Sequence, residues 1–160
     1  MAARYTDTEI LGLLSEKKLL PDGYRQRLRL RDRNGQRECE CRVVGANGNE
    51  FWLKIRQTKF NPLDFSVILA VRLPNSNQLF RLRRYNGRHG LHVNRIEGDR
   101  LSGCHVHTAT QRYQELGARE DAYAEPSEDF ATLDEALNCL LRDCGFDVPP
   151  DAQLPLFKER

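Results

Sequence analysis

Histidine is the most informative residue type in this chain, because all four copies fall in one short stretch. They are His89, His92, His105 and His107, and the last two form a His-x-His pair. Imidazole can donate or accept a proton near neutral pH and is also a common metal ligand. The crowding of four imidazoles therefore predicts a functional site between residues 89 and 107.

The residues between the two histidine pairs predict a β-hairpin that would bring the imidazoles together. Gly98 suits the first central position of a type II′ turn, with Asp99 as the second. In that register His92 lies opposite His105, and His107 projects from the same face. Opposed side chains on a sheet have Cβ atoms roughly 5 Å apart, and next neighbours on one face are roughly 7 Å apart. We therefore expect three imidazoles to act on one small ligand.

Proton transfer at a phosphate ester is the leading interpretation of this cluster. One imidazole would act as general base and another as general acid, while an arginine stabilises the phosphate charge, as in RNA cleavage without a metal ion. This chemistry requires no cofactor, and it needs a polar side chain such as Asn94 to orient a histidine. The candidate catalytic residues are His92, His105, His107, Asn94 and Arg84.

Two alternatives remain open for the same residues. Three histidines could bind a metal ion, completed by Glu115, Glu120 or Asp121, although the spacing differs from established metal motifs. Alternatively, the histidines are structural and hydrogen-bond to the acidic segment 115–129. That segment belongs to a polar stretch, 111–126, which we interpret as a solvated loop with one short strand, or as a lid whose carboxylates orient the histidines.

The elements around the site are predicted from periodicity and turn chemistry. Thr6 and Glu9 form a capping box that begins a helix over 7–18. From Tyr24 the period changes to two, which predicts a strand with a basic ridge. The turn Asn34-Gly35 would set Arg31 opposite Glu38, Arg29 opposite Glu40 and Leu28 opposite Cys41.

The next turn fixes a second register in the same way. A loop of residues 46–48, with Gly48 in the left-handed position, pairs Val43 with Phe51 and Glu40 with Lys54. Strands are expected over 67–73 and 80–85, and a second capping box at Thr132 begins a C-terminal helix. The expected core comprises Leu28, Leu30, Val43, Phe51, Leu53, Ile55, Leu69, Val71, Phe80, Leu82, Leu137 and Leu140.

Charge is distributed unevenly along the chain, although the net charge is only +2. Residues 24–100 carry 17 Lys and Arg against 7 Asp and Glu, whereas residues 101–147 carry 3 against 10. The basic part could face an anionic partner such as nucleic acid, or it could face the acidic part. Arginines around an aromatic residue suit phosphate contact and base stacking. The candidate nucleic-acid-binding residues are Arg27, Arg42, Trp52, Lys54, Arg56, Arg83 and Arg88.

Size and composition indicate one globular domain. The 160 residues are 39% hydrophobic and 30% charged, which is typical of a folded protein with a charged surface. No apolar run reaches the length of a membrane span, so we expect a cytoplasmic protein without a membrane partner. The five cysteines lack C-x-x-C spacing, which favours reduced thiols over a disulfide framework.

The run from Phe80 to Phe146 resembles a family of small uncharacterised bacterial proteins. The shared features are Phe80-Arg81-Leu82 with Asn86-Gly87, then His92-Val93-Asn94, then His105-Val106-His107, then Ala122-Tyr123-Ala124 and the closing amphipathic helix. They cover a little under half of the chain. Members look like accessory or defence-related genes, so the resemblance implies an RNA-directed or partner-binding role without supplying an activity.

Together these observations predict one α+β domain over 1–148, followed by a tail over 149–160. Its fold would be a curved, mostly antiparallel sheet or partial barrel of about six or seven strands, with an N-terminal and a C-terminal helix. The expected function is that of a nucleic-acid-acting protein, in particular a metal-independent RNA phosphodiesterase of a defence or toxin-antitoxin system. The alternative is a non-enzymatic module whose charged faces bind a partner protein or nucleic acid, or a three-histidine metal-binding protein.

Overall fold

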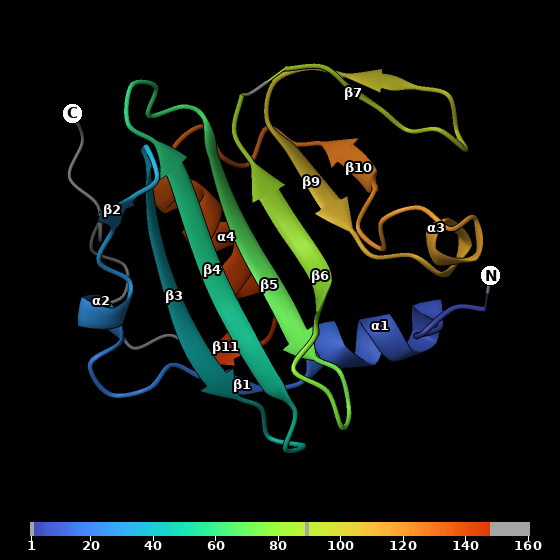
Figure 1. Cartoon of the computed structure of the whole chain (residues 1–160), viewed down its shortest axis with the longest axis horizontal. Helices are drawn as coiled ribbons and strands as arrows, with labels where there is room; N and C mark the ends of the chain where they lie inside the picture. The colour runs from blue at the N-terminus through green and yellow to red at the C-terminus, as the bar shows by residue number, and fades with distance from the viewer. Residues whose placement is uncertain (1, 89, 148–160) are drawn as a thin grey trace.

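The computed structural model describes residues 2–88 and 90–147, and its centre is a curved, seven-stranded antiparallel sheet (Figure 1). Its strands are β2 (Arg31–Arg33), β3 (Gln36–Val44), β4 (Glu50–Thr58), β5 (Phe65–Arg72), β6 (Leu79–Asn86), β9 (His105–Thr108) and β10 (Tyr123–Pro126). They are arranged in the order β10-β9-β6-β5-β4-β3-β2, so the sheet does not close into a barrel. The predicted α+β fold, with six or seven mostly antiparallel strands, is confirmed.

Two capped helices contribute apolar side chains to the core beside this sheet. These are α1 (Asp7–Ser15) and α4 (Leu133–Asp143), and both begin with the predicted capping boxes at Thr6 and Thr132. In Figure 1, α4 lies behind β4 to β6. The remaining elements are the short helices α2 (Tyr24–Arg27) and α3 (Gln111–Glu115), the parallel pair β1 (Lys18–Leu19) with β11 (Phe146–Asp147), and the antiparallel pair β7 (His92–Val93) with β8 (Arg100–Leu101).

The register between β3 and β4 gives the sheet two different faces. Val43 pairs with Phe51 and Glu40 pairs with Lys54, as the turn at 46–48 predicts. Along β4, the side chains Phe51, Leu53 and Ile55 are buried in one core with the apolar side of α4. The alternating residues of β4 point the other way, because successive side chains in a strand project to opposite faces. We call this second face, opposite α4, the open face.

The hydrophobic core contains the residues that the alternating pattern identifies. Eleven of the twelve expected core residues are buried, and Leu30 is partly buried against the same cluster. This one cluster joins residues from both capped helices and from the sheet. The predicted tail, 149–160, lies outside the described residues. No helix in the described part of the chain combines the length and the apolar character needed to cross a bilayer.

The predicted strand beginning at Tyr24 is wrong, because residues 24–27 form the helix α2. Tyr24 and Leu28 are both buried, and their spacing of four residues places them on one side of a helix. Only Arg31–Arg33 pairs with β3, so Arg31 lies opposite Glu38 as expected, whereas the Arg29 and Leu28 pairings do not form. Burial of two large side chains at helical spacing therefore overrides the alternation of arginines.

The predicted register of the histidine hairpin is also wrong. His92 pairs with Leu101 and Val93 pairs with Arg100, so the chain reverses through a longer loop than a two-residue turn. His105 belongs to β9, which lies between β6 and β10 and pairs with both. A strand in that position has ladder partners on both sides, whereas the predicted hairpin would have given it one. Nearby turn chemistry indicates the reversal of the chain and does not determine this choice of partners.

Candidate functional site

Three imidazoles meet where β7 approaches β9. The ring centroids of His92 and His107 are 4.7 Å apart, those of His105 and His107 are 5.0 Å apart, and those of His92 and His105 are 5.7 Å apart with nearly parallel planes. On the neighbouring strand β6, Arg84 pairs with His107 and Asn86 pairs with His105. The structure thus brings the three predicted histidines together, although through a different strand arrangement from the predicted one.

Backbone carbonyl groups fix the orientation of the two β9 histidines. His105 Nδ1 lies 2.9 Å from the carbonyl oxygen of Gly103, and His107 Nδ1 lies 2.7 Å from that of Asp121. A carbonyl oxygen only accepts hydrogen bonds, so each Nδ1 carries the proton and donates. In the neutral ring, Nε2 is then the nitrogen that can accept a proton.

Asn94 determines which ring nitrogen of His92 carries the proton. Its side chain is fully buried, and its amide nitrogen donates to the carbonyl oxygen of Ala124 at 2.8 Å and to Asp99 Oδ1 at 3.0 Å. Its Oδ1 accepts from the Ala124 amide at 2.9 Å, which fixes the orientation of the Asn94 amide. His92 Nε2 lies 3.0 Å from the same Oδ1, so Nε2 is the donor. Asn94 therefore holds His92 in place, as the sequence predicts for a polar orienting residue.

Asp121 connects two groups of the site through different atoms. Its carboxylate oxygen Oδ2 accepts from Arg84 Nε at 3.1 Å, while its backbone carbonyl accepts from His107. Asp121 is completely buried, and Arg81 Nε lies 3.8 Å from the same carboxylate oxygen. Segment 111–126 thus contributes a buried carboxylate and orienting backbone groups, through α3 and β10, and part of the acidic half of the chain does face the basic half.

The surroundings of His107 keep its ring neutral. Burial, followed by the positive charge of Arg84, lowers the pKa of His107 from 6.5 to about 2. The other two imidazoles lower this pKa further by repulsion. At neutral pH, His107 is therefore an uncharged ring whose proton is held on Nδ1 by the Asp121 carbonyl.

The three imidazoles line a pocket with a positively charged wall. Its volume is about 270 Å³, and it is lined by Arg84, Asn86, Gly90, Leu91, His92, His105, His107, Arg119 and Ala122. We call it the histidine pocket. Its described lining contains two guanidinium groups and no carboxylate, and the Asp121 carboxylate that pairs with Arg84 is completely buried, so the lining favours an anion. Among the described residues, no set of three or more His, Cys, Asp or Glu side chains is arranged to hold a metal ion. The donor arrangement thus gives no support to the three-histidine metal site.

The predicted nucleic-acid-binding residues do not form one surface. Arg83 lies on the α4 side of the sheet, where Tyr85 and Asp143 surround it, so it is separated from the histidines. Arg27 is exposed on α2, beyond the β3 edge, and Arg88 is exposed in the loop after β6. Arg42, Trp52, Lys54 and Arg56 share the open face.

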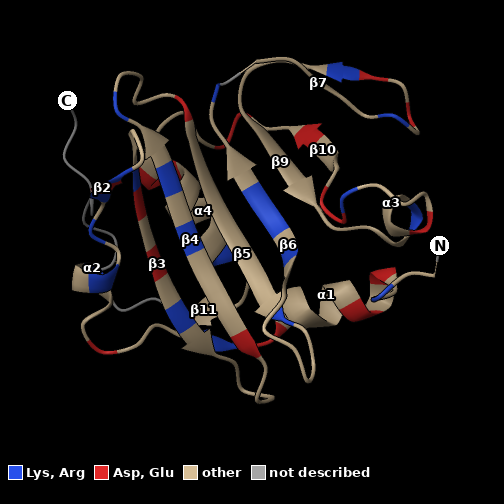
Figure 2. Cartoon of the chain, in the orientation of Figure 1, with Lys and Arg blue, Asp and Glu red and all other residues tan. Residues whose placement is uncertain are grey.

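Acidic residues lie among the basic residues of β3 and β4 (Figure 2), and two of the three basic side chains just named are paired. Arg42 Nε lies 2.6 Å from Glu50, and Lys54 Nζ lies 3.7 Å from Glu40. Arg56 differs, because it donates to the hydroxyl group of Ser66 at 3.1 Å and makes no ion pair within the part of the chain that the structure describes. No carboxylate in the described ranges, 2–88 and 90–147, therefore neutralises the charge of Arg56.

Sequence reasoning missed two residues of the site and the partner of a third. Arg119 and Asn86 line the histidine pocket, and the carboxylate of Asp121 holds Arg84 rather than a metal ion. Asp121 was among the expected carboxylates, but its partner depends on how segment 111–126 folds back over β9. Asn86 could have been found from the β6–β9 register, since it pairs with His105. Nothing in the sequence pattern indicates the position of Arg119.

Comparison with models of protein families, with curated proteins and with solved structures finds no match to this chain. The resemblance of 80–146 to a bacterial family therefore stays a prediction, and the function has to be argued from the site itself.

Proposed function

We propose that this protein is a metal-independent phosphodiesterase that cleaves RNA, with the histidine pocket as its active site. The observation that carries this proposal is the meeting of three imidazoles, with ring centroids no more than 5.7 Å apart, in a pocket also lined by Arg84 and Arg119. The arginines would bind the phosphate group, and the imidazoles would supply the proton transfers. RNA is the preferred substrate because its 2′-hydroxyl group provides a nucleophile without a metal-bound water.

The reaction requires one proton acceptor and one proton donor. The 2′-oxygen attacks the phosphorus atom while one imidazole removes its proton, and the bond from phosphorus to the 5′-oxygen breaks as a second imidazolium protonates that oxygen. The products are a 2′,3′-cyclic phosphate and a free 5′-hydroxyl group, so atoms and charges balance. We assign the two proton transfers to His92 and His105, whose rings lie nearly parallel.

The remaining groups of the pocket orient the catalytic side chains and stabilise the charge on the phosphate. His107 stays neutral, because its pKa is lowered to about 2, and its ring packs between those of His92 and His105 without taking part in the proton transfers. Asn94 positions His92, and Asp121 positions Arg84. Charge that develops on the phosphate oxygens would be stabilised by the Arg84 and Arg119 guanidinium groups.

A ribonuclease assay in the presence of a metal chelator tests this proposal. The wild-type protein should cleave single-stranded RNA and leave a cyclic phosphate end. His105→Gln and His92→Gln should each lower kcat by about 100-fold or more, the ordinary contribution of a general acid or base. The wild-type pH–rate profile should be bell-shaped, and each variant should lose one limb.

The unfolding midpoint of each variant serves as the control for folding. Unchanged cleavage in His105→Gln and in His92→Gln, with both variants folded, would contradict the catalytic assignment. Cleavage that disappears with the chelator and returns with a divalent ion would contradict the metal-independent mechanism.

A second candidate, a module that binds a partner protein, is favoured by the apolar surface of the β7–β8 hairpin. Leu91, Val93 and Ile96 are 62%, 42% and 46% exposed there. Binding of a partner through this surface would be almost insensitive to salt, whereas binding of RNA weakens steeply as salt increases. A salt titration of any binding activity therefore separates the two candidates.

A further inference from the structure

We propose that the RNA substrate lies across the open face of the sheet, from the histidine pocket on β9 to the side chain of Arg56 on β4, and that Arg56 binds a phosphate group beyond the scissile one. This inference rests on the proposed function. It adds to that function a single-stranded substrate longer than a dinucleotide and a second anion-binding position.

Two rows of paired residues connect the histidine pocket to β4. In one row, Lys54 pairs with Ile68, Ile68 with Arg84, and Arg84 with His107. In the other, the pairs run from Arg56 through Ser66 and Asn86 to His105. Directly paired residues in a sheet project from the same face. The histidines and Arg56 therefore lie on the same face of the sheet, with no helix between them in Figure 1. The partly exposed path follows the first row, because Lys54, Ile68 and Arg84 are half-buried, whereas Ser66 and Asn86 in the second row are covered.

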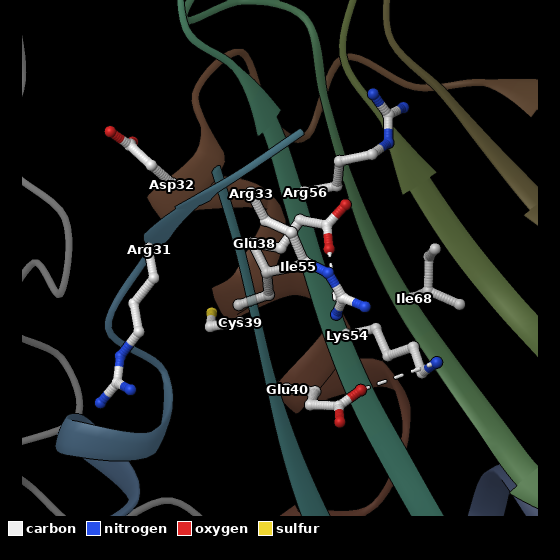
Figure 3. Close-up of a pocket in the computed structure, with 10 residues that line it drawn as sticks. All are labelled: Arg31, Asp32, Arg33, Glu38, Cys39, Glu40, Lys54, Ile55, Arg56 and Ile68. Atoms are coloured by element: carbon white, nitrogen blue, oxygen red, sulfur yellow. Dashed lines mark ion pairs between the residues drawn. The ribbon is translucent and has the colours of Figure 1, made fainter. Parts of the chain in front are cut away.

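A second hollow on this surface adjoins the histidine pocket. It has a volume of about 490 Å³ and is lined by Arg31, Asp32, Arg33, Glu38, Cys39, Glu40, Lys54, Ile55, Arg56 and Ile68 (Figure 3). Four of these residues are basic and three are acidic, and we call this the second hollow. Ile68 lines the second hollow and Arg84 lines the histidine pocket, and these two residues are directly paired. One pair of side chains thus separates the two hollows.

Arg56 is held in position by a chain of hydrogen bonds to uncharged side chains. Arg56 Nη2 donates to Ser66 Oγ at 3.1 Å, and Ser66 Oγ donates to Asn86 Oδ1 at 2.7 Å. Ser66 and Asn86 are each only 1% exposed. In Figure 3 the Arg56 side chain extends away from Glu38 and Glu40, while Lys54 pairs with Glu40. Arg56 therefore presents an oriented positive charge that pairs with no carboxylate of the described residues, which suits a phosphate group.

The reach of the Arg56 side chain sets which linkage of the RNA it can contact. Three strand-to-strand steps separate the backbones of β4 and β9, which corresponds to about 14 Å at the usual spacing of ~4.8 Å. The side chain spans part of this distance, because Arg56 Nη2 donates to Ser66 on β5 and Ser66 donates to Asn86, which lines the histidine pocket. A phosphate bound at Arg56 would therefore belong to a linkage close to the scissile one in the same strand. Trp52, on the same face of β4, lies further along this surface as an aromatic side chain on which a base could stack.

The test uses a labelled RNA of about eight nucleotides, a typical length for a single-strand binding surface. All of its 2′-oxygens are methylated, so that it binds without being cleaved. Arg56→Gln removes the charge and keeps a donor for Ser66. Arg142→Gln is the matched control, because it removes the same charge from α4, behind the sheet.

Arg56→Gln should weaken binding of this RNA about five-fold and should make the plot of log affinity against log salt less steep by about 0.7, the value for one lost phosphate contact on a single strand. The loss should be smaller for a methylated dinucleotide, because its single phosphate occupies the histidine pocket and leaves none for Arg56. Arg142→Gln should bind like the wild-type protein.

Each other outcome has a separate meaning. Equal losses in Arg56→Gln and Arg142→Gln would reduce the effect to overall charge and overturn the inference. If the wild-type protein cleaves RNA but Arg56→Gln binds the longer RNA normally, the proposed RNA position across Arg56 is wrong and the proposed function stands. If no RNA is cleaved but binding still depends on Arg56, the proposed RNA position stands and the proposed function fails. Polyglutamate that binds as tightly as the RNA, and also depends on Arg56, would contradict the proposal that this face binds a nucleic acid.

Discussion

Lys18 and the histidine pocket are both groups of buried polar side chains, but they use their hydrogen-bonding capacity differently. Lys18 is 1% exposed, and its ammonium group donates to the carbonyl oxygens of Leu13, Leu14, Glu16 and Cys144 at 2.7–3.1 Å. It also lies 4.4 Å from the centre of the Phe51 ring. Burial lowers the pKa of Lys18 to about 8.

In the histidine pocket, by contrast, each imidazole uses one nitrogen for a fixed acceptor and has a second nitrogen of opposite character. These acceptors are Asn94, the Gly103 carbonyl and the Asp121 carbonyl. All the carbonyl partners of Lys18 belong to the protein itself, so it has no remaining donor for a ligand. The comparison separates a polar cluster whose donors are all used within the fold from one that we propose binds a ligand.

Replacement of the lysine is the most disruptive way to test this comparison. Lys18→Met should lower the free energy of unfolding by about 3 kcal/mol or more, because several buried carbonyl groups lose their donor. Urea denaturation measures this change. His92→Gln, at a half-buried side chain, should lower the free energy of unfolding by less than about 1 kcal/mol. A Lys18→Met protein that is as stable as His92→Gln would show that the two clusters are energetically alike.

The pH dependence of stability distinguishes the clusters in a second way. The unfolded chain binds a proton at its 107 imidazole near pH 6.5, whereas the folded protein does so only near pH 2. Acidification therefore favours the unfolded state between these values, and this group can remove up to about 1.4 kcal/mol per pH unit below pH 6.5. Denaturation curves from pH 7 to pH 4 should fall less steeply for His107→Gln than for the wild-type protein. Parallel curves would mean that His107 is readily protonated in the fold.

The smallest expected effect concerns Glu16, which is buried beside Lys18. Its carboxylate accepts from the Asn47 amide at 3.0 Å and from Asn49 Nδ2 at 2.6 Å, and a Cβ atom at Gly45 would lie 2.0 Å from its Oε2. Gly45→Ala should therefore lower the free energy of unfolding by about 2 kcal/mol through overpacking. Gly12→Ala, in α1 with open space around the new atom, should instead raise it by a few tenths to about 1 kcal/mol. Equal shifts in melting temperature would contradict the close packing at Gly45.

The parts of the fold that were predicted correctly are those specified by neighbouring residues. Asn34 and Gly35 both have positive φ, at 51° and 80°, as a two-residue hairpin turn requires, and the turn at 46–48 sets the whole β3–β4 register. Both capping boxes depend on residues three positions apart. Such features need no information about the rest of the chain.

The incorrect predictions concern contacts between distant residues. The strand predicted at Tyr24 was based on the alternation of arginines, whereas the burial of Tyr24 and Leu28 favours a helix. The partners of β9 depend on β6 and β10, which lie on either side of it in sequence. The site was found because histidine is rare in this chain and all four copies lie close together. Its orienting groups were harder to find, because backbone carbonyls of Gly103 and Asp121 leave no signature in the residue types.

The parallel pair β1–β11 has a consequence for the order in which the molecule assembles. Lys18 pairs with Phe146, and its ammonium group also needs the carbonyl oxygen of Cys144. Contacts between residues so far apart in sequence form slowly, because a long loop must close first. During synthesis, the segment after α1 can reach its final environment only when α4 has been made. The described fold is therefore completed at a late step. The burial of Lys18 is a more direct measure of that step than the packing of the histidines is.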